Sequence, residues 1–221
     1  AVAVIYFQKL NPFSPSKSAR QKQATWALWI KIVIACIPAA VLGLLFDDWM
    51  EAHLYNAYVV AATLIIYGVL FIVLENSSIT ANPSITKVGH VSTKTALFIG
   101  LFQLLSLVPG TSRSGSTILG AMVLGCSRGV AAEFSFFLGI PVMFGASFLK
   151  LVKFFVKGNV LTGPQIFYTI LGMAIAFGVS VYSIQFLMGY VRRHDFKFFG
   201  YYRIILGVVV LAYFGITALA A

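Results

Sequence analysis

The sequence predicts an all-α integral membrane protein, built as a polytopic bundle of helices. Of its 221 residues, 60% are hydrophobic and only 10% are charged, a composition far too apolar for a water-soluble domain. The apolar residues form long runs separated by polar connections, and several runs reach the roughly 20 residues that a helix needs to cross a hydrocarbon core. The chain therefore falls in the class of multi-pass membrane proteins.

The charge balance is strongly basic, with a formal net charge of +10, and most of this charge lies in the connections between apolar runs. Basic loops of this kind set the topology of a membrane protein and contact anionic lipid head groups. We therefore expect membrane lipids, and no nucleic acid, as partners of these charges. One such basic loop is expected at residues 191–203, which includes Arg203.

We treat residues 1–221 as a single transmembrane domain. Residues 1–7 are apolar but too short to cross a membrane, and we expect them to be the tail of a helix. A short acidic turn is expected at residues 47–53, and Pro38 should kink the helix before it. The predicted complete spans are residues 24–46, 54–74, 129–149, 165–190 and 204–220.

Two neighbouring apolar runs are too short to span. Residues 95–108 offer about 14 mostly apolar positions and residues 117–126 about 10, which is too few for an ordinary transmembrane helix. We therefore predict a re-entrant helix-loop-helix at residues 95–126, with its bend at residues 109–117 (PGTSRSGST).

The bend has the chemistry of an anion site. Gly110 and Gly115 allow close approach of the backbone to a ligand, and Arg113 offers a planar, permanently charged fork that matches phosphate oxygens. We expect Ser116 or Thr117 to cap the outgoing helix, whose N-terminus favours an anion. Hydroxyl donors are added by Thr111, Ser112, Ser114 and Ser116.

Two other interpretations of the bend are weaker. Glycine and serine clusters also serve as helix-packing surfaces in membranes, but packing does not require Arg113, and intramembrane arginine is rare. Residues 110–117 also approach the nucleotide-binding pattern G-x-x-x-x-G-K-[ST]. They carry Ser116 in place of the lysine that reaches the phosphates, and they lack the strand that precedes such a loop.

Two further polar residues lie in apolar segments. Glu133 is expected to pair with Arg113 or Arg128, with a metal ligand or general base as the alternative. Gln103, on the helix that enters the bend, either orients the ligand or makes a helix-helix hydrogen bond.

Several segments together resemble one protein family. They are residues 37–46 (IPAAVLGLLF), 100–103 (GLFQ), 109–117 (PGTSRSGST), 127–128 (SR) and 132–136 (AEFSF). The chain closely resembles the bacterial undecaprenyl-diphosphate phosphatases, the bacitracin-resistance protein family, over essentially its whole length.

The resemblance implies a fold and an activity. The fold is an inverted-topology repeat in which each half contributes a re-entrant helix pair, and the protein is expected to be a homodimer in the bacterial cytoplasmic (inner) membrane. The substrate is a polyprenyl diphosphate lipid. Removal of its terminal phosphate recycles the carrier for peptidoglycan synthesis and cell wall biogenesis, and contributes to bacitracin resistance.

The resemblance also assigns the site residues. The catalytic residues would be Arg113, Ser112 and Ser114. The diphosphate would be held by Gly110, Thr111, Arg113, Gly115, Ser116, Thr117 and Gln103. Glu133 and Arg128 would contact these residues and hold them in place without binding the diphosphate themselves. A divalent cation, Mg²⁺ or Ca²⁺, would be the cofactor.

The family has a second, glutamate-rich motif near its N-terminus that supplies the metal-binding carboxylates together with a serine and a histidine. No such motif occurs in this sequence, and we expect an N-terminal segment of roughly 50 residues to be absent, judged from two or three membrane segments of about 20 residues each. We predict that the purified 221-residue chain is inactive alone. Robust phosphate release by this chain would contradict the prediction.

A polyprenyl-phosphate transporter or flippase is the main alternative, because broken helices that present their N-termini to anionic substrates are also a transporter signature. A purely structural membrane subunit leaves Arg113 unexplained. The histidines that a soluble-type lipid phosphatase needs beside its serine and arginine are not seen.

Overall fold

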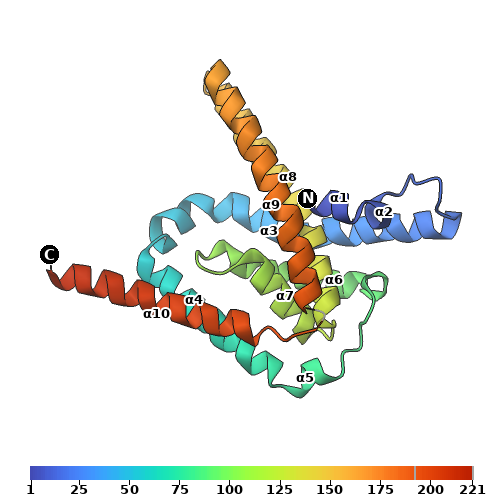
Figure 1. Ribbon diagram of the computed structural model, residues 1–221, viewed down its shortest axis with the longest axis horizontal. Coiled ribbons are helices and arrows are strands. Elements are labelled where there is room, and N and C mark those ends of the chain that lie inside the picture. The colour runs from blue at the N-terminus through green and yellow to red at the C-terminus, as the bar shows by residue number, and fades with distance from the viewer. Residues whose placement is uncertain (192, 221) are drawn as a thin grey trace.

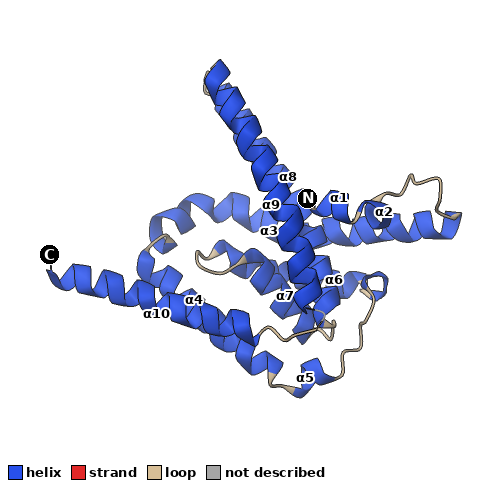
Figure 2. Cartoon of the chain, in the orientation of Figure 1, coloured by secondary structure: helices blue, strands red, loops and turns tan. Residues whose placement is uncertain are grey.

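The computed structural model describes residues 1–191 and 193–220, and this part of the chain is built from helices and their connecting loops (Figures 1 and 2). The α-helices are α1 (Val2–Ile5), α2 (Phe7–Leu10), α3 (Ala19–Leu54), α4 (Ala57–Glu75), α5 (Ser78–Ala81), α6 (Thr93–Leu104), α7 (Arg113–Val123), α8 (Arg128–Val156), α9 (Gly163–Val191) and α10 (Lys197–Ala220). Two 3₁₀ turns, η1 (Val88–His90) and η2 (Leu105–Leu107), complete the set.

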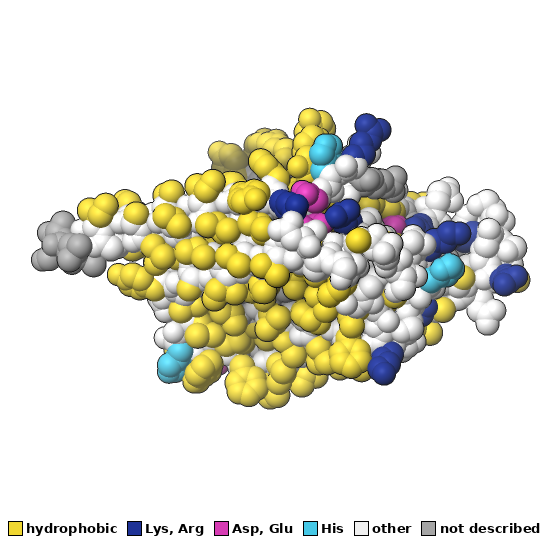
Figure 3. Space-filling view, turned by 90° about the horizontal axis from the view of Figure 1, so that it is seen from below, with side chains coloured by type: hydrophobic (Ala, Val, Ile, Leu, Met, Phe, Trp, Pro, Cys, Tyr) yellow, Lys and Arg dark blue, Asp and Glu magenta, His cyan; other side chains and the backbone are white. Residues whose placement is uncertain are grey.

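Five helices are long and apolar enough to cross a membrane, which confirms the predicted class of multi-pass membrane protein. The candidate spans are Ala19–Phe46, Ala57–Glu75, Arg128–Val156, Gly163–Val191 and Lys197–Thr217. Figure 3 shows the corresponding surface, in which hydrophobic side chains cover much of the face in view while lysine and arginine gather toward one part of it.

Several helix ends differ from the predicted boundaries. The acidic turn expected at residues 47–53 is wrong, since α3 runs through it to Leu54. This stretch contains neither glycine nor proline to end a helix, and the chain turns instead at Asn56, whose side chain accepts from the Val59 N–H at 2.9 Å and caps α4. Pro38 lies inside α3, which follows a curved path in Figure 1.

The other differences follow from local capping. Ser18 and Gln21 form a capping box that starts α3 at Ala19, five residues before the predicted span. Residues 1–7 are not one helix tail, because the backbone breaks at Tyr6 between two single-turn helices. Helix α8 continues beyond residue 149 to Val156, and α10 begins at Lys197, so that Arg203 is helical and not in a loop.

The predicted hairpin at residues 95–126 forms as α6, η2 and α7. Helix α7 has only 11 residues, too few to span, and eight of them, Gly115 to Met122, are buried. It packs against α6, α8 and α4, so the hairpin lies within the bundle, and its loop is half-buried, with Thr111 buried. The bundle thus covers part of the polar loop, as a polar loop in a membrane protein requires, and the re-entrant insertion stays a prediction.

Helices α4 and α10 are held together at glycines. A Cβ atom added to Gly68 would lie 2.7 Å from the Gly200 carbonyl oxygen, and one added to Gly200 would lie 2.8 Å from that of Gly68. A Cβ on Gly207 would similarly meet the Ala61 carbonyl oxygen at 2.9 Å. The two backbones therefore touch directly, as in other membrane helix pairs with small residues at the contact.

A buried carboxylate ties three segments together at the end of α4. Arg128, at the start of α8, donates its Nε to Glu75 at 2.9 Å and pairs with the same carboxylate through Nη2, while the Phe196 N–H donates to Glu75 at 2.9 Å. The Glu75 side chain is fully buried. One residue thus fixes where α4, α8 and the loop before α10 meet.

We expect Glu75→Gln to destabilise the protein by about 2–3 kcal/mol, because it leaves Arg128 without its anionic partner. Thermal unfolding in detergent measures the effect. Glu51→Gln, at an exposed carboxylate in α3, is the matched control and should change little. Equal unfolding temperatures for the two variants would contradict the assignment.

Candidate functional site

The bend between α6 and α7 is shaped by Gly110, which has φ +84°, a conformation that residues with a side chain rarely adopt. A Cβ atom here would lie 2.2 Å from Thr63 Oγ1 and 2.6 Å from the Val60 carbonyl oxygen. Both the conformation and the close approach of α4 therefore require glycine, and they place the bend directly against α4.

Helix α7 begins earlier than predicted. Ser112 is its N-cap and accepts from the Gly115 N–H at 3.2 Å, so the expectation that Ser116 or Thr117 caps this helix is wrong. Both residues lie in the second turn and are fully buried. The Ser116 hydroxyl donates to the Arg113 carbonyl at 3.0 Å, and the Thr117 hydroxyl shares a hydrogen bond of 2.7 Å with Ser135. The Thr117 hydroxyl therefore joins α7 to α8, while the Ser116 hydroxyl is bonded within α7.

Arg113 and Gln103 do meet at one site. Both line a cavity of about 530 Å³. Arg113 Nη1 and both amide atoms of Gln103 are buried without a hydrogen-bond partner among the described residues. Leaving buried polar atoms unpaired is costly, so these three atoms indicate a site for a polar ligand that brings both donors and acceptors.

The rest of this cavity is mostly apolar. Small residues form much of its lining, namely Ala39, Ala40 and Gly43 on α3 and Gly145 and Ala146 on α8. Arg113 lies across α8 at Gly139, where an added Cβ would come within 2.6 Å of Arg113 Nη2. The site thus combines one positively charged end with an apolar wall, which suits an amphiphilic anion.

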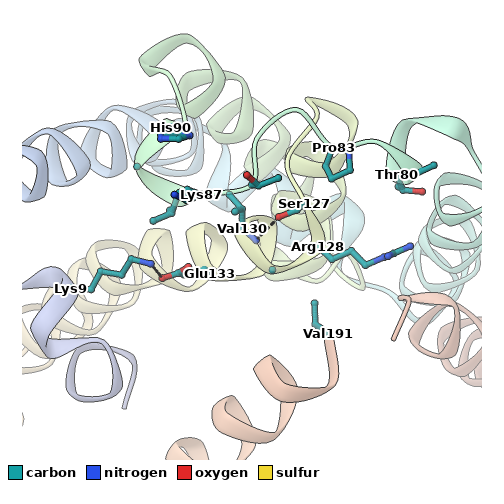
Figure 4. A pocket seen from close by; sticks show the side chains of 15 residues that line it. Lys9, Thr80, Pro83, Lys87, His90, Ser127, Arg128, Val130, Glu133 and Val191 are labelled. Atoms are coloured by element: carbon teal, nitrogen blue, oxygen red, sulfur yellow. Dashed lines mark hydrogen bonds and ion pairs between the residues drawn. The ribbon is translucent and has the colours of Figure 1, made fainter. Parts of the chain in front are cut away.

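Glu133 and Arg128 lie elsewhere. Glu133 pairs with Lys9 and not with Arg113 or Arg128, so the expected pairing is wrong. Five residues separate positions 128 and 133, which turns them about 140° apart around α8. Arg128 consequently reaches Glu75, while Glu133 faces α2. Both line a second, polar cavity of about 740 Å³ together with Lys87 (Figure 4).

The residues described here do not fit a divalent cation. Among them, no group of three histidine, cysteine, aspartate or glutamate side chains could hold a metal ion. The two buried carboxylates, Glu75 and Glu133, are each engaged by a cation of the protein. We therefore derive no step through a metal.

One residue at the site was missed by the sequence reasoning. Arg203, expected in a basic loop, lies in α10 and donates its Nη2 to the Gly110 carbonyl at 3.4 Å. A signal was present in the sequence, because Gly200, Arg203 and Gly207 are spaced by three and four residues and so share one helix face. That face packs on α4.

Comparison with known proteins places the chain in a family. The model of the family described as "Bacitracin resistance protein BacA" matches residues 1–209. A protein of Streptococcus thermophilus (strain CNRZ 1066), named undecaprenyl-diphosphatase, is 57% identical over 213 residues, which cover 96% of this chain and 74% of the relative.

Two further relatives carry the same name. The protein of Streptococcus mutans serotype c is 56% identical over 96% of this chain and 76% of its own length. The protein of Enterococcus faecalis (strain ATCC 700802 / V583) is 53% identical over 96% of this chain and 77% of its own length. The chain belongs to the BacA family.

Proposed function

We propose that the chain is an undecaprenyl-diphosphatase, which hydrolyses undecaprenyl diphosphate to undecaprenyl phosphate and inorganic phosphate. This reaction recycles the lipid carrier for peptidoglycan synthesis and contributes to bacitracin resistance. The observation that carries the proposal is the unpaired, buried Arg113 Nη1 beside the unpaired Gln103 amide at one end of an apolar cavity. The names of the relatives and the BacA family support it.

Arg113 is the principal anion ligand in this proposal. Its guanidinium would take two phosphate oxygens in the bidentate geometry that lysine cannot reproduce. As negative charge grows on the phosphoryl oxygens during hydrolysis, a fixed cation lowers the barrier without having to reorganise. The Gln103 amide, with one donor and one acceptor group free, would orient the diphosphate.

The start of α7 adds neutral donors. Of the N–H groups in its first turn, that of Gly115 is bound by Ser112, whereas those of Arg113 and Ser114 have no carbonyl partner within the helix, and a helix N-terminus favours an anion. The hydroxyls of Ser112 and Ser114 lie 3.1 Å apart in a shared hydrogen bond at this end of α7. Neither serine lines the Arg113 cavity, so we propose that they hold the start of α7 in place beside the reacting phosphate.

The apolar part of the cavity would receive the first isoprenoid units of the lipid. Its wall of small side chains on α3 and α8 leaves a slot next to Arg113, and burying a hydrocarbon chain there contributes about 0.8 kcal/mol for each CH₂ group. The substrate would thus enter from the bilayer, in keeping with a multi-pass protein whose family resides in the bacterial inner membrane.

We also propose a homodimer, supported by α9. The window of this helix that could span a membrane has no buried residue, so its apolar surface is open to lipid or to a second copy. Disulfide cross-linking between cysteines introduced along α9, read on a denaturing gel, tests this contact. Absence of any cross-linked pair in membranes would count against a dimer through α9.

The test of function is phosphate release from undecaprenyl diphosphate in detergent, by the protein together with the N-terminal segment expected above. Parallel reactions contain Arg113→Ala, and each is repeated with EDTA to test the predicted dependence on Mg²⁺ or Ca²⁺. Release that the substitution abolishes would support the proposal. Tight substrate binding that depends on Arg113, without release, would instead favour a lipid transporter.

A further inference from the structure

The far side of the bend is held by helices that do not line the Arg113 cavity. The Thr63 hydroxyl of α4 lies 2.8 Å from the Pro109 carbonyl, its shortest contact, and 2.9 and 3.0 Å from two carbonyls of its own helix. Arg203 of α10 donates Nη2 to the Gly110 carbonyl at 3.4 Å. Two consecutive carbonyl groups of the bend are therefore fixed by two side chains from adjacent helices.

Arg203 is not an ordinary surface cation, because part of its guanidinium group is buried. Its Nη1 is buried and has no partner among the described residues. The same nitrogen lies 3.5 Å from where a Cβ of Gly115 would stand, and Ser112 Oγ lies 3.4 Å from that point. Tyr67 of α4 lies beside both Arg203 and Thr111. The Arg203 guanidinium group thus lies against the N-terminal turn of α7.

The orientation of the two carbonyls matters for an anion. A carbonyl oxygen carries partial negative charge and would repel a diphosphate, whereas the N–H groups at the start of α7 attract it. Holding the oxygens of Pro109 and Gly110 toward α4 and α10 keeps their negative ends away from the N–H groups at the start of α7. A positive charge behind the turn adds to the potential at the same place.

We propose that Arg203 is a positioning residue of the diphosphate site, which with Thr63 clamps the Pro109 and Gly110 carbonyls away from the anion. Arg203 acts through the bend and does not touch the substrate, since it does not line the cavity that contains Arg113 and Gln103. This inference rests on the proposed function. It adds a second arginine, from the last helix, to the diphosphate-binding machinery.

The experiment compares Arg203→Met with Arg203→Lys in the full-length protein. Methionine keeps much of the length and apolar contact of arginine but cannot donate, while lysine keeps the charge and one reachable donor. Lys197→Met, on the same helix at a cation that pairs only loosely with Asp195 at 3.7 Å, is the matched control. The readouts are kcat and KM for phosphate release, and the unfolding temperature with and without inorganic diphosphate.

We expect Arg203→Met to lower kcat/KM by about 10- to 100-fold and to remove the stabilisation by inorganic diphosphate. Its unfolding temperature without diphosphate should stay near that of the wild type. Arg203→Lys should restore most of the stabilisation by diphosphate, and Lys197→Met should behave as the wild type. Should Arg203→Met fail to fold, the nearly isosteric Thr63→Val removes the neighbouring donor and should shift both readouts in the same direction.

Unchanged kcat/KM and unchanged diphosphate stabilisation in Arg203→Met would overturn the inference. A second result would also overturn it: lower activity in Arg203→Met that Arg203→Lys does not relieve, with an equal drop in unfolding temperature in the presence and absence of diphosphate. That combination is the signature of a purely structural residue. Full activity of Arg113→Ala in the same preparation would instead overturn the proposed function. An inactive Arg113→Ala beside a fully active Arg203→Met would overturn only the role of Arg203.

Discussion

Replacing Arg113 with lysine should lower phosphate release at least about 100-fold, even though the charge is kept. Lysine is a point charge on a flexible stem and cannot span two phosphate oxygens, and loss of one preorganised donor to a transition-state oxyanion costs about 10²- to 10³-fold. The measurement is kcat/KM for undecaprenyl diphosphate in detergent. Because the interaction strengthens as charge develops, we expect the larger part of the loss in kcat.

The matched control for this substitution is Arg193→Lys, at an exposed arginine in the loop before α10. It makes the same chemical change away from the cavity and should leave kcat/KM unchanged. Near-wild-type activity of Arg113→Lys would show that the fork geometry is unimportant, and the bidentate clamp would have to be abandoned.

Gly110→Ala should both destabilise the protein and remove most of its activity. The alanine would adopt φ +84°, which costs about 1–2 kcal/mol. Its Cβ would also collide with Thr63 Oγ1 at 2.2 Å and with the Val60 carbonyl oxygen at 2.6 Å. The second contact is with backbone and cannot be relieved by a rotamer change, so the bend must move away from α4 and carry Arg113 with it.

Gly158→Ala separates these two effects. Gly158 also has a positive φ, +75°, but an added Cβ there meets no atom within 4 Å. It should therefore show the conformational cost alone, as a small decrease in unfolding temperature with activity retained. If Gly110→Ala were no worse than Gly158→Ala in either measurement, the close approach of α4 to the bend would not constrain the site.

Much of the fold could be predicted because the membrane imposes a minimum length on every span. The five apolar runs gave five candidate spans, and the two short runs gave α6 and α7. Helix ends were harder, since residues 47–53 are polar yet contain no residue that ends a helix, and α3 continues through them. A hydropathy pattern predicts which residues lie in lipid, but it does not predict the residue at which a helix ends.

The site was predictable to the extent that its chemistry is local. Arg113 is conspicuous as a charge among apolar segments, and Gln103 lies close before it in sequence; both line the same cavity. The partner of Glu133 was not predictable, because Lys9 is 124 residues away and meets it only through the packing of α2 beside α8. The spacing of Arg203 with Gly200 and Gly207 predicts one shared helix face, but the contact of Arg203 with Gly110 was not predictable, since it depends on how α10 lies against α4.

The small side chains around the Arg113 cavity carry a consequence for antibiotic design. A competitive inhibitor of this site needs an anionic head for Arg113 and an apolar tail that fills the space left by the small side chains of Gly43, Gly145 and Ala146. Bacteria commonly escape a drug by enlarging a residue that touches it. Here any such enlargement narrows the slot proposed for the enzyme's own lipid, so escape at these positions should slow growth of the cell wall.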